Sequence, residues 1–133
     1  MSRSLIQTAS QSSLNLSVGD VIPLGSVVRR YGCNCQLNGN AIAIEGTGYY
    51  TIDATATLQP TEAGDVSVAL YKNGVVVPGS TVTGSVPDVG SSITLPIVAT
   101  VRETCCEAPS ELTLVLTENG SSGAAASMRV EKT

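Results

Sequence analysis

The run from Gly46 to Ser80 constrains the fold of this chain more than any other feature. From residue 50 to residue 58 every second residue is apolar, and the residues between them are Thr or Asp. This period of two places one face of a strand against a core and turns the other face outward. The same period returns at 66–70, and Asn73-Gly74 then supplies the two positive-φ residues of a tight type I′ hairpin. The run therefore predicts antiparallel β-structure, and nothing in it points to catalysis.

Length and composition define the class of protein. The chain has 133 residues, which is enough for one domain with its own core and too few for two. It contains no His, Trp or Phe and only four Tyr, so the core must be built from Val, Ile, Leu and Ala, with Thr as filler. The lack of His removes the commonest general base and the commonest metal ligand. We therefore expect neither an enzyme nor a bound cofactor or metal.

Charge and hydropathy limit the partners. The formal net charge is −4, and the basic residues are scattered except for Arg29-Arg30, so no nucleic-acid surface is expected. No stretch approaches the roughly 18 apolar residues of a membrane helix, and the first 20 residues lack the apolar run of a signal peptide. We expect synthesis in the cytoplasm without a leader and no membrane partner. Because only 14% of residues are charged, a covered surface and tight self-association are expected.

Along its length the chain divides into about eight to ten short strands. Residues 1–19 are rich in Ser, Gln and Asn and suit an N-terminal arm or a peripheral strand, whereas 20–133 form the domain. The predicted strands are 21–30, 41–45, 49–58, 66–72, 75–77, 81–86, 92–102, 112–117 and 124–132. Pro96 predicts a bulge or an edge position for the strand that contains it. The fold class is all-β, an antiparallel β-sandwich and most simply a jelly roll.

Three segments carry a resemblance to a known superfamily. They are Gly-x-Gly-Tyr-Tyr-x-Ile-x-Ala at 46–54, Val-x-Val-x-Leu-Tyr-Lys-Asn-Gly at 66–74, and the strand ITLPIVATVR at 93–102. Their order resembles the C1q and TNF-like jelly roll over roughly residues 40–132. The chain is most similar to the bacterial and bacteriophage versions, which include the heads of spore-surface collagen-like glycoproteins and short proteins encoded among phage structural genes. It lacks a collagen-like Gly-X-Y stalk.

The resemblance implies a homotrimer of three jelly rolls packed around a threefold axis. The candidate interface residues are Tyr49, Tyr71, Val98 and Val101. Tyr49 and Tyr71 are out of phase with the inward alternation of their strands, so they are expected to face outward. Each candidate has the alternative of a place in the core of the protomer, as expected for Tyr50.

Four cysteines form the pairs Cys33-x-Cys35 and Cys105-Cys106. Each pair follows a strand that ends in Arg, so an up-and-down arrangement brings both pairs to one end of the sandwich. Three states of these cysteines are open. Zinc sites use Cys-x-x-Cys spacing, which neither pair has. Disulfides between the loops or between subunits suit a particle that leaves the reducing cytoplasm. Free, partly buried thiols are the simplest expectation.

The sequence thus favours a non-enzymatic structural protein, a homotrimer bound into a larger assembly and located in a bacteriophage or prophage virion as a capsid-decoration, head or tail-fibre accessory component. A spore-coat or cell-surface module of the same fold is the alternative. A carbohydrate-binding module is a second alternative, with Tyr31 as its candidate residue, although sugar platforms usually carry more exposed aromatic side chains than this chain offers.

Overall fold

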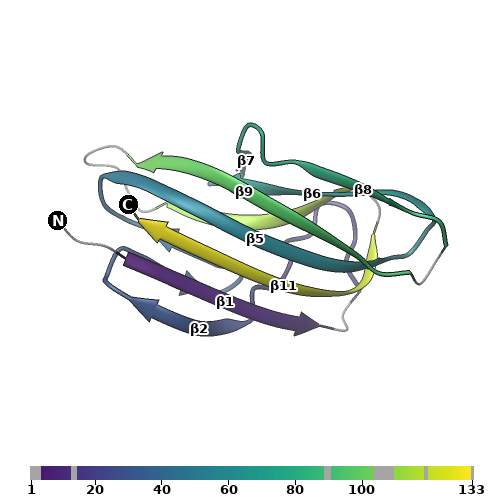
Figure 1. The fold of residues 1–133 in the computed structure, drawn as a ribbon, viewed down its shortest axis with the longest axis horizontal. Coiled ribbons are helices and arrows are strands. Elements are labelled where there is room, and N and C mark those ends of the chain that lie inside the picture. The colour runs from purple at the N-terminus through teal and green to yellow at the C-terminus, as the bar shows by residue number, and fades with distance from the viewer. Residues whose placement is uncertain (1–3, 13–14, 89–90, 104–109, 119, 133) are drawn as a thin grey trace.

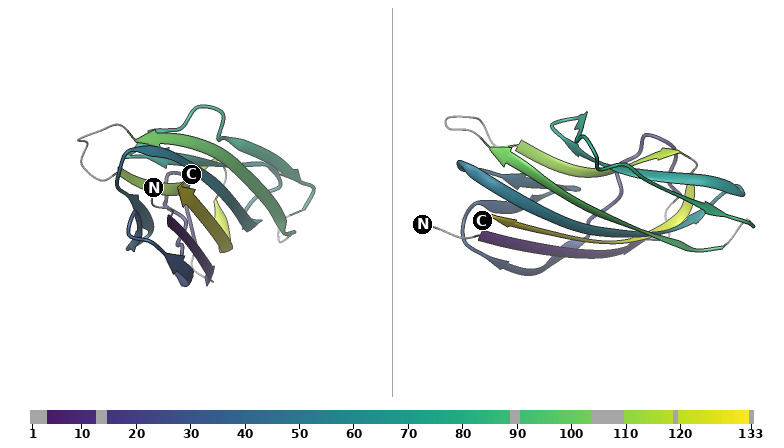
Figure 2. Two further views of the ribbon diagram at one scale, coloured as in Figure 1. Left: turned by 60° about the vertical axis from the view of Figure 1, so that its left-hand side comes forward. Right: turned by 45° about the horizontal axis from the view of Figure 1, so that its top comes forward.

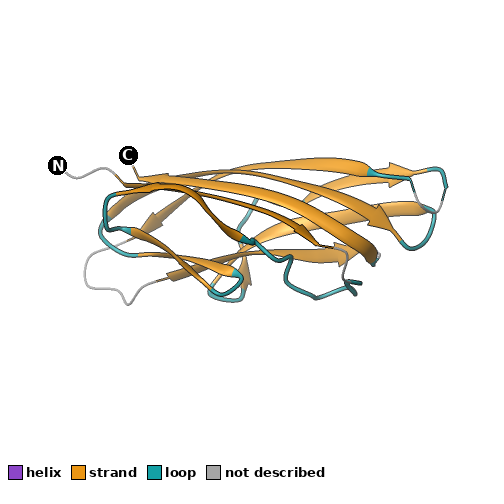
Figure 3. Ribbon diagram, turned by 90° about the horizontal axis from the view of Figure 1, so that it is seen from below, coloured by secondary structure: helices purple, strands orange, loops and turns teal. Residues whose placement is uncertain are grey.

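A computed structural model describes residues 4–12, 15–88, 91–103, 110–118 and 120–132 of the chain. These residues form eleven strands. The strands are β1 (Ser4–Ser12), β2 (Ser26–Tyr31), β3 (Cys35–Asn38), β4 (Ala41–Ile44), β5 (Gly48–Pro60), β6 (Gly64–Lys72), β7 (Val75–Val76), β8 (Val82–Val86), β9 (Ile93–Glu103), β10 (Ser110–Glu118) and β11 (Ser121–Lys132). Figure 3 draws the described residues as strands and loops, and they include no helix that could cross a membrane.

The strands form two antiparallel sheets stacked face to face (Figures 1 and 2). The first sheet has the order β2-β1-β11-β5-β9. The second has the order β3-β4-β10-β6-β7, with β8 also paired to β6. The predicted all-β antiparallel sandwich is confirmed.

Strand β5 follows the sequence pattern closely, whereas on β6 Ser67 and Ala69, expected to face outward, are buried as well. On β5 the apolar residues Tyr50, Ile52, Ala54, Ala56 and Leu58 are all buried, and the residues between them face outward. Asn73 and Gly74 have φ values of +53° and +81°, which fits the tight turn that joins β6 to β7. Pro96 lies on β9, an edge strand of the first sheet, and the register of β9 against β5 runs without a bulge. An edge strand tolerates proline because its outer N–H groups need no partner in the sheet.

Residues 4–12 and 15–24 form part of the sandwich. β1 pairs with β11 on one side and with β2 on the other. Beyond β1, Leu16 and Ser121 exchange two backbone hydrogen bonds, and the amide of Ile22 donates to the carbonyl of Leu114 at 2.7 Å. Ile22 and Leu24 are fully buried. The described residues before β2 therefore contribute a strand with a neighbour on each side and part of the core.

One end of the sandwich is polar inside. It is called the Cys35 end, and it contains Cys35, Tyr50 and the turn at residues 45–46 that precedes β5. Tyr50 is the largest fully buried side chain, and its hydroxyl contacts the carbonyl oxygens of Glu45 at 2.8 Å and Gly46 at 2.9 Å. Burial raises the pKa of the Cys35 thiol to about 11. Burial also raises the pKa of the Tyr50 phenol to about 12, and the nearby Cys35 adds to this rise. Both groups are therefore protonated in the folded protein well beyond neutral pH.

These two groups predict a loss of stability in alkali. The unfolded chain releases the Cys35 proton from about pH 9, two units before the folded chain does, so the contribution of this group is complete below pH 9 and declines as the pH rises towards 11. The corresponding window for Tyr50 runs from about pH 10 to 12. Urea midpoints measured between pH 8 and 12 should fall across both windows. A Cys35→Ala variant should show a shallower fall between pH 9 and 11, and an equal fall in both proteins would contradict this assignment.

Candidate association surface

Exposed apolar side chains of the described residues gather along β2 and β9, the edge strands of the first sheet, and on β7, an edge strand of the second sheet. The large ones are Val18, Val27, Val28, Tyr31, Tyr49, Val75, Val76 and Val98. Three of them lie on β2 and are called the β2 patch: Val27, Val28 and Tyr31. Four lie on or beside β9 at the opposite edge and are called the β9 patch: Tyr49, Val75, Val76 and Val98. β2 and β9 mark the two edges in Figure 1.

The β9 patch joins a flat face to a groove. Tyr49 and Val98 are 54% and 69% exposed on the outer face of neighbouring strands. The Arg102 guanidinium lies 5.8 Å from the centre of the Tyr49 ring, within cation–π range. Around the edge of β9, a groove of about 320 Å³ runs between Thr100–Arg102 and Val75–Pro78. The patch therefore offers apolar surface on two adjoining sides of one strand.

The β2 patch lies on a strand with no buried residue, since all six residues of β2 are exposed. β2 pairs with β1 on one side and is the edge of the sheet on the other. Arg29 and Arg30 lie within it, and the Arg30 Nε donates to the carbonyl of Cys35 at 2.8 Å. An edge strand with exposed valines is the kind of surface that natural proteins usually cover.

Between the patches, the outer face of the first sheet carries small polar side chains and one compact charge network. Arg129 contacts Asp53 and Glu131, each at 3.1 Å. Thr51, Thr55 and Ser127 share this face. Short side chains and locally paired charges let another protein surface approach the sheet closely.

The structure separates the four predicted interface residues. Tyr49 and Val98 lie together on the outer face of the first sheet. Tyr71 is half-buried on the outer face of the second sheet, where it lies between Thr113 and Val76. Val101 is only 6% exposed and packs in the hydrophobic core, because it faces inward opposite Tyr50. Val101 therefore lines the groove beside β9 but is not one of the exposed apolar side chains.

Sequence reasoning missed the β2 patch and the exposed Val75-Val76 pair. A signal for both was present. Val27-Val28 and Val75-Val76 are adjacent apolar residues, and adjacent residues of a strand point to opposite faces, so at least one member of each pair faces away from the core.

Two of the four cysteines belong to the described residues. Cys33 is exposed, Cys35 is buried, and both are free thiols. Cys105 and Cys106 lie outside the described residues. In the described ranges, no three Cys, Asp or Glu side chains gather in a way that could hold a metal ion.

Comparison with known proteins gives the fold. No protein-family model matches the chain, and no curated protein matches its sequence. Among solved structures, the globular domain of zebrafish complement 1qA protein matches with a TM-score of 0.71 at 8% identity, over 95% of this chain and 94% of that one. Murine APRIL matches with a TM-score of 0.72 at 9% identity, over 99% and 100%.

A third match is a viral protein. The vertex protein P5 of phage PRD1 gives a TM-score of 0.60 at 10% identity, over 97% of this chain and 72% of that one. Identities this low establish architecture alone. Together with the two-sheet topology, the matches show that this chain has the jelly-roll fold of the C1q and TNF-like domains.

Proposed function

We propose that this protein is a non-enzymatic structural component that assembles as a homotrimer and forms part of a bacteriophage or prophage virion. The observation that carries the proposal is the pair of apolar patches at β2 and β9, the two edge strands of the first sheet, with the second patch extending onto β7 of the other sheet. A closed ring of three needs a head-to-tail contact, in which two different surfaces of each protomer meet. The β2 patch and the β9 patch are two such surfaces.

In the proposed trimer, the β9 patch of one protomer packs against the β2 patch and the outer sheet face of the next. The small side chains of that face allow close approach, and the Arg129 network leaves few unpaired charges to desolvate. The resemblance to C1q and TNF-like jelly rolls supports the stoichiometry of three. The shared fold with a phage vertex protein supports a place in a virion. Peptide mass spectrometry of particles purified after lysis tests that place. The proposal predicts that the chain is present in the particles at a fixed stoichiometry.

Charge insertion at the two patches tests the proposed contact. Val98→Asp and Val28→Asp each introduce a carboxylate at a residue that is more than half exposed in the protomer, so the fold of the protomer should be preserved. At a packed interface the same change costs about 2 kcal/mol per contact or more, roughly a 30-fold rise in the dissociation constant. Analytical ultracentrifugation should show both variants dissociating at concentrations where the parent remains a trimer.

Val18→Asp is the matched control. Val18 is 57% exposed, comparable to Val28 at 54%, and belongs to neither patch. It should leave the assembly unchanged. The proposed contact is wrong if Val98→Asp and Val28→Asp sediment like Val18→Asp.

A further inference from the structure

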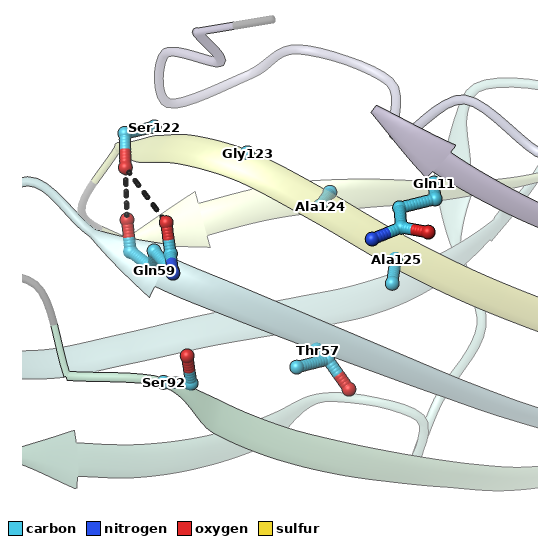
Figure 4. A pocket seen from close by; sticks show the side chains of 8 residues that line it. All are labelled: Gln11, Thr57, Gln59, Ser92, Ser122, Gly123, Ala124 and Ala125. Atoms are coloured by element: carbon cyan, nitrogen blue, oxygen red, sulfur yellow. Dashed lines mark hydrogen bonds between the residues drawn. The ribbon is translucent and has the colours of Figure 1, made fainter. Parts of the chain in front are cut away.

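The outer face of the first sheet carries a second hollow, far from the Tyr49 side of the β9 patch. It is a groove of about 380 Å³ at the end of β5 that precedes β6 (Figure 4). Its lining residues come from β1, β5, β11 and the segment that leads into β9: Gln11, Thr57, Gln59, Ser92, Ser122, Gly123, Ala124 and Ala125. Along β5, Thr57 is about 26 Å from Tyr49, at roughly 3.3 Å per residue. The groove is therefore separate from the apolar surface at Tyr49 and Val98.

A β-bulge in β11 forms the groove. Ser121 lies opposite Pro60 and Ala124 lies opposite Leu58, so β11 holds one residue more than β5 between these pairs. The extra residue pushes Ser122 and Gly123 out of the regular ladder, and bulges of this kind often occur next to functional sites because they redirect side chains. Beyond the bulge, the short side chain of Ala125 leaves the floor open, and the side chain of Ala124 faces the core.

The groove presents uncharged hydrogen-bonding groups. In the described part of the chain, neither the Gln11 carboxamide nor the Ser92 hydroxyl makes a hydrogen bond. The Ser122 hydroxyl reaches Gln59 only at long range, 3.3 Å to its carbonyl oxygen and 3.5 Å to its side-chain oxygen. Figure 4 shows these side chains around one opening. The groove thus has several donors and acceptors whose best partners are not within the protein.

The lining selects a class of ligand. None of the eight lining residues is ionisable, so the groove has no charged partner for a phosphate, a carboxylate or an ammonium group. Carboxamides and hydroxyls suit the hydroxyl groups of a sugar, and the Cβ atom of Ala125 suits the C–H face of its ring. The volume is within the range of roughly 300–1,000 Å³ found for small-molecule sites.

We propose that this groove binds a neutral saccharide. The groove is distinct from Tyr31, the residue that sequence reasoning favours for sugar binding, which lies on β2 next to Leu5 and so towards the Cys35 end. The proposal does not depend on the trimer.

The test is a titration of the ¹⁵N-labelled full chain with maltose, cellobiose, lactose and N,N′-diacetylchitobiose, followed by NMR. At least one disaccharide should shift the backbone amides of Gln59, Ser122 and Ala125 and the side-chain amide of Gln11. Gln11→Ala should weaken that binding roughly threefold to tenfold, the effect of one lost hydrogen bond. Ala125→Leu fills the groove and should abolish the shifts.

Gln7→Ala is the matched control, because Gln7 lies on the same face of β1 but outside the groove. It should bind like the parent, and a dispersed spectrum for each variant shows that it is folded. The proposal is overturned if none of the four disaccharides shifts the groove amides. It is also overturned if Gln11→Ala and Ala125→Leu bind as tightly as Gln7→Ala.

Discussion

A Lys72→Met variant should lose about 3 kcal/mol of folding stability, the lower part of the range for breaking a buried ion pair from one side. Lys72 on β6 contacts Glu103 on β9 at 2.9 Å, and this pair joins the two sheets at the Cys35 end. The Glu103 side chain is 2% exposed, whereas the Lys72 side chain is 25% exposed. Without the ammonium group, the carboxylate stays buried and keeps the Ser110 hydroxyl, 2.8 Å away, as a hydrogen-bond donor.

Removal of the other partner of the ion pair should cost less folding stability. In Glu103→Gln the Lys72 ammonium can still turn towards water and still has the Arg102 carbonyl at 3.0 Å, so a loss of about 1 kcal/mol is expected. Replacing both residues by Met and Leu should recover most of the stability lost in Lys72→Met. Urea unfolding at one fixed protein concentration measures all three. Equal losses for Lys72→Met and Glu103→Gln would show that the burial of Glu103 does not govern the energetics of this pair.

Truncation of Tyr50 should have the second large effect. Tyr50 is fully buried and is the only aromatic residue of the core among the described residues. Tyr50→Ala leaves a cavity between the sheets and removes the hydroxyl that contacts Glu45 and Gly46, so a loss of about 3–5 kcal/mol is expected. The melting temperature and the urea midpoint should both fall.

Tyr50→Phe separates the two contributions. It keeps the ring and removes only the hydroxyl, for an expected loss of about 1 kcal/mol. If Tyr50→Phe were as destabilising as Tyr50→Ala, the hydrogen bonds to the 45–46 turn, rather than core packing, would dominate the role of Tyr50.

The parts of the fold that follow from sequence are those with strong local signals. β5 alternates over its whole buried length, and Asn73-Gly74 is the dipeptide that a tight hairpin requires. The position of β1 in the first sheet had no such signal in the sequence. Its residues are mostly polar, and only pairing with β11 and β2, which lie far along the chain, makes Ser4 and Thr8 buried residues. The short strand β3 was missed for the same reason.

The candidate association surface was predictable from the sequence only in part. Phase along β5 correctly turned Tyr49 outward, because that property is local to one strand. The same reasoning left Val98 and Val101 as joint candidates, although they lie three residues apart on β9 and therefore on opposite faces. Which strands form the edges of a sheet depends on long-range pairing, so the adjacent valines of β2 indicated one outward side chain but not the exposure of all six residues.

The solution mass of the purified protein, measured by light scattering with and without reductant, tests the central claim most directly. The protomer has a mass of 13.6 kDa. The account predicts a particle of three protomers whose mass does not change with reductant, because apolar contact between the β2 and β9 patches holds it together. A particle with the mass of one protomer would contradict the trimeric assembly and leave the two patches without the partner proposed for them.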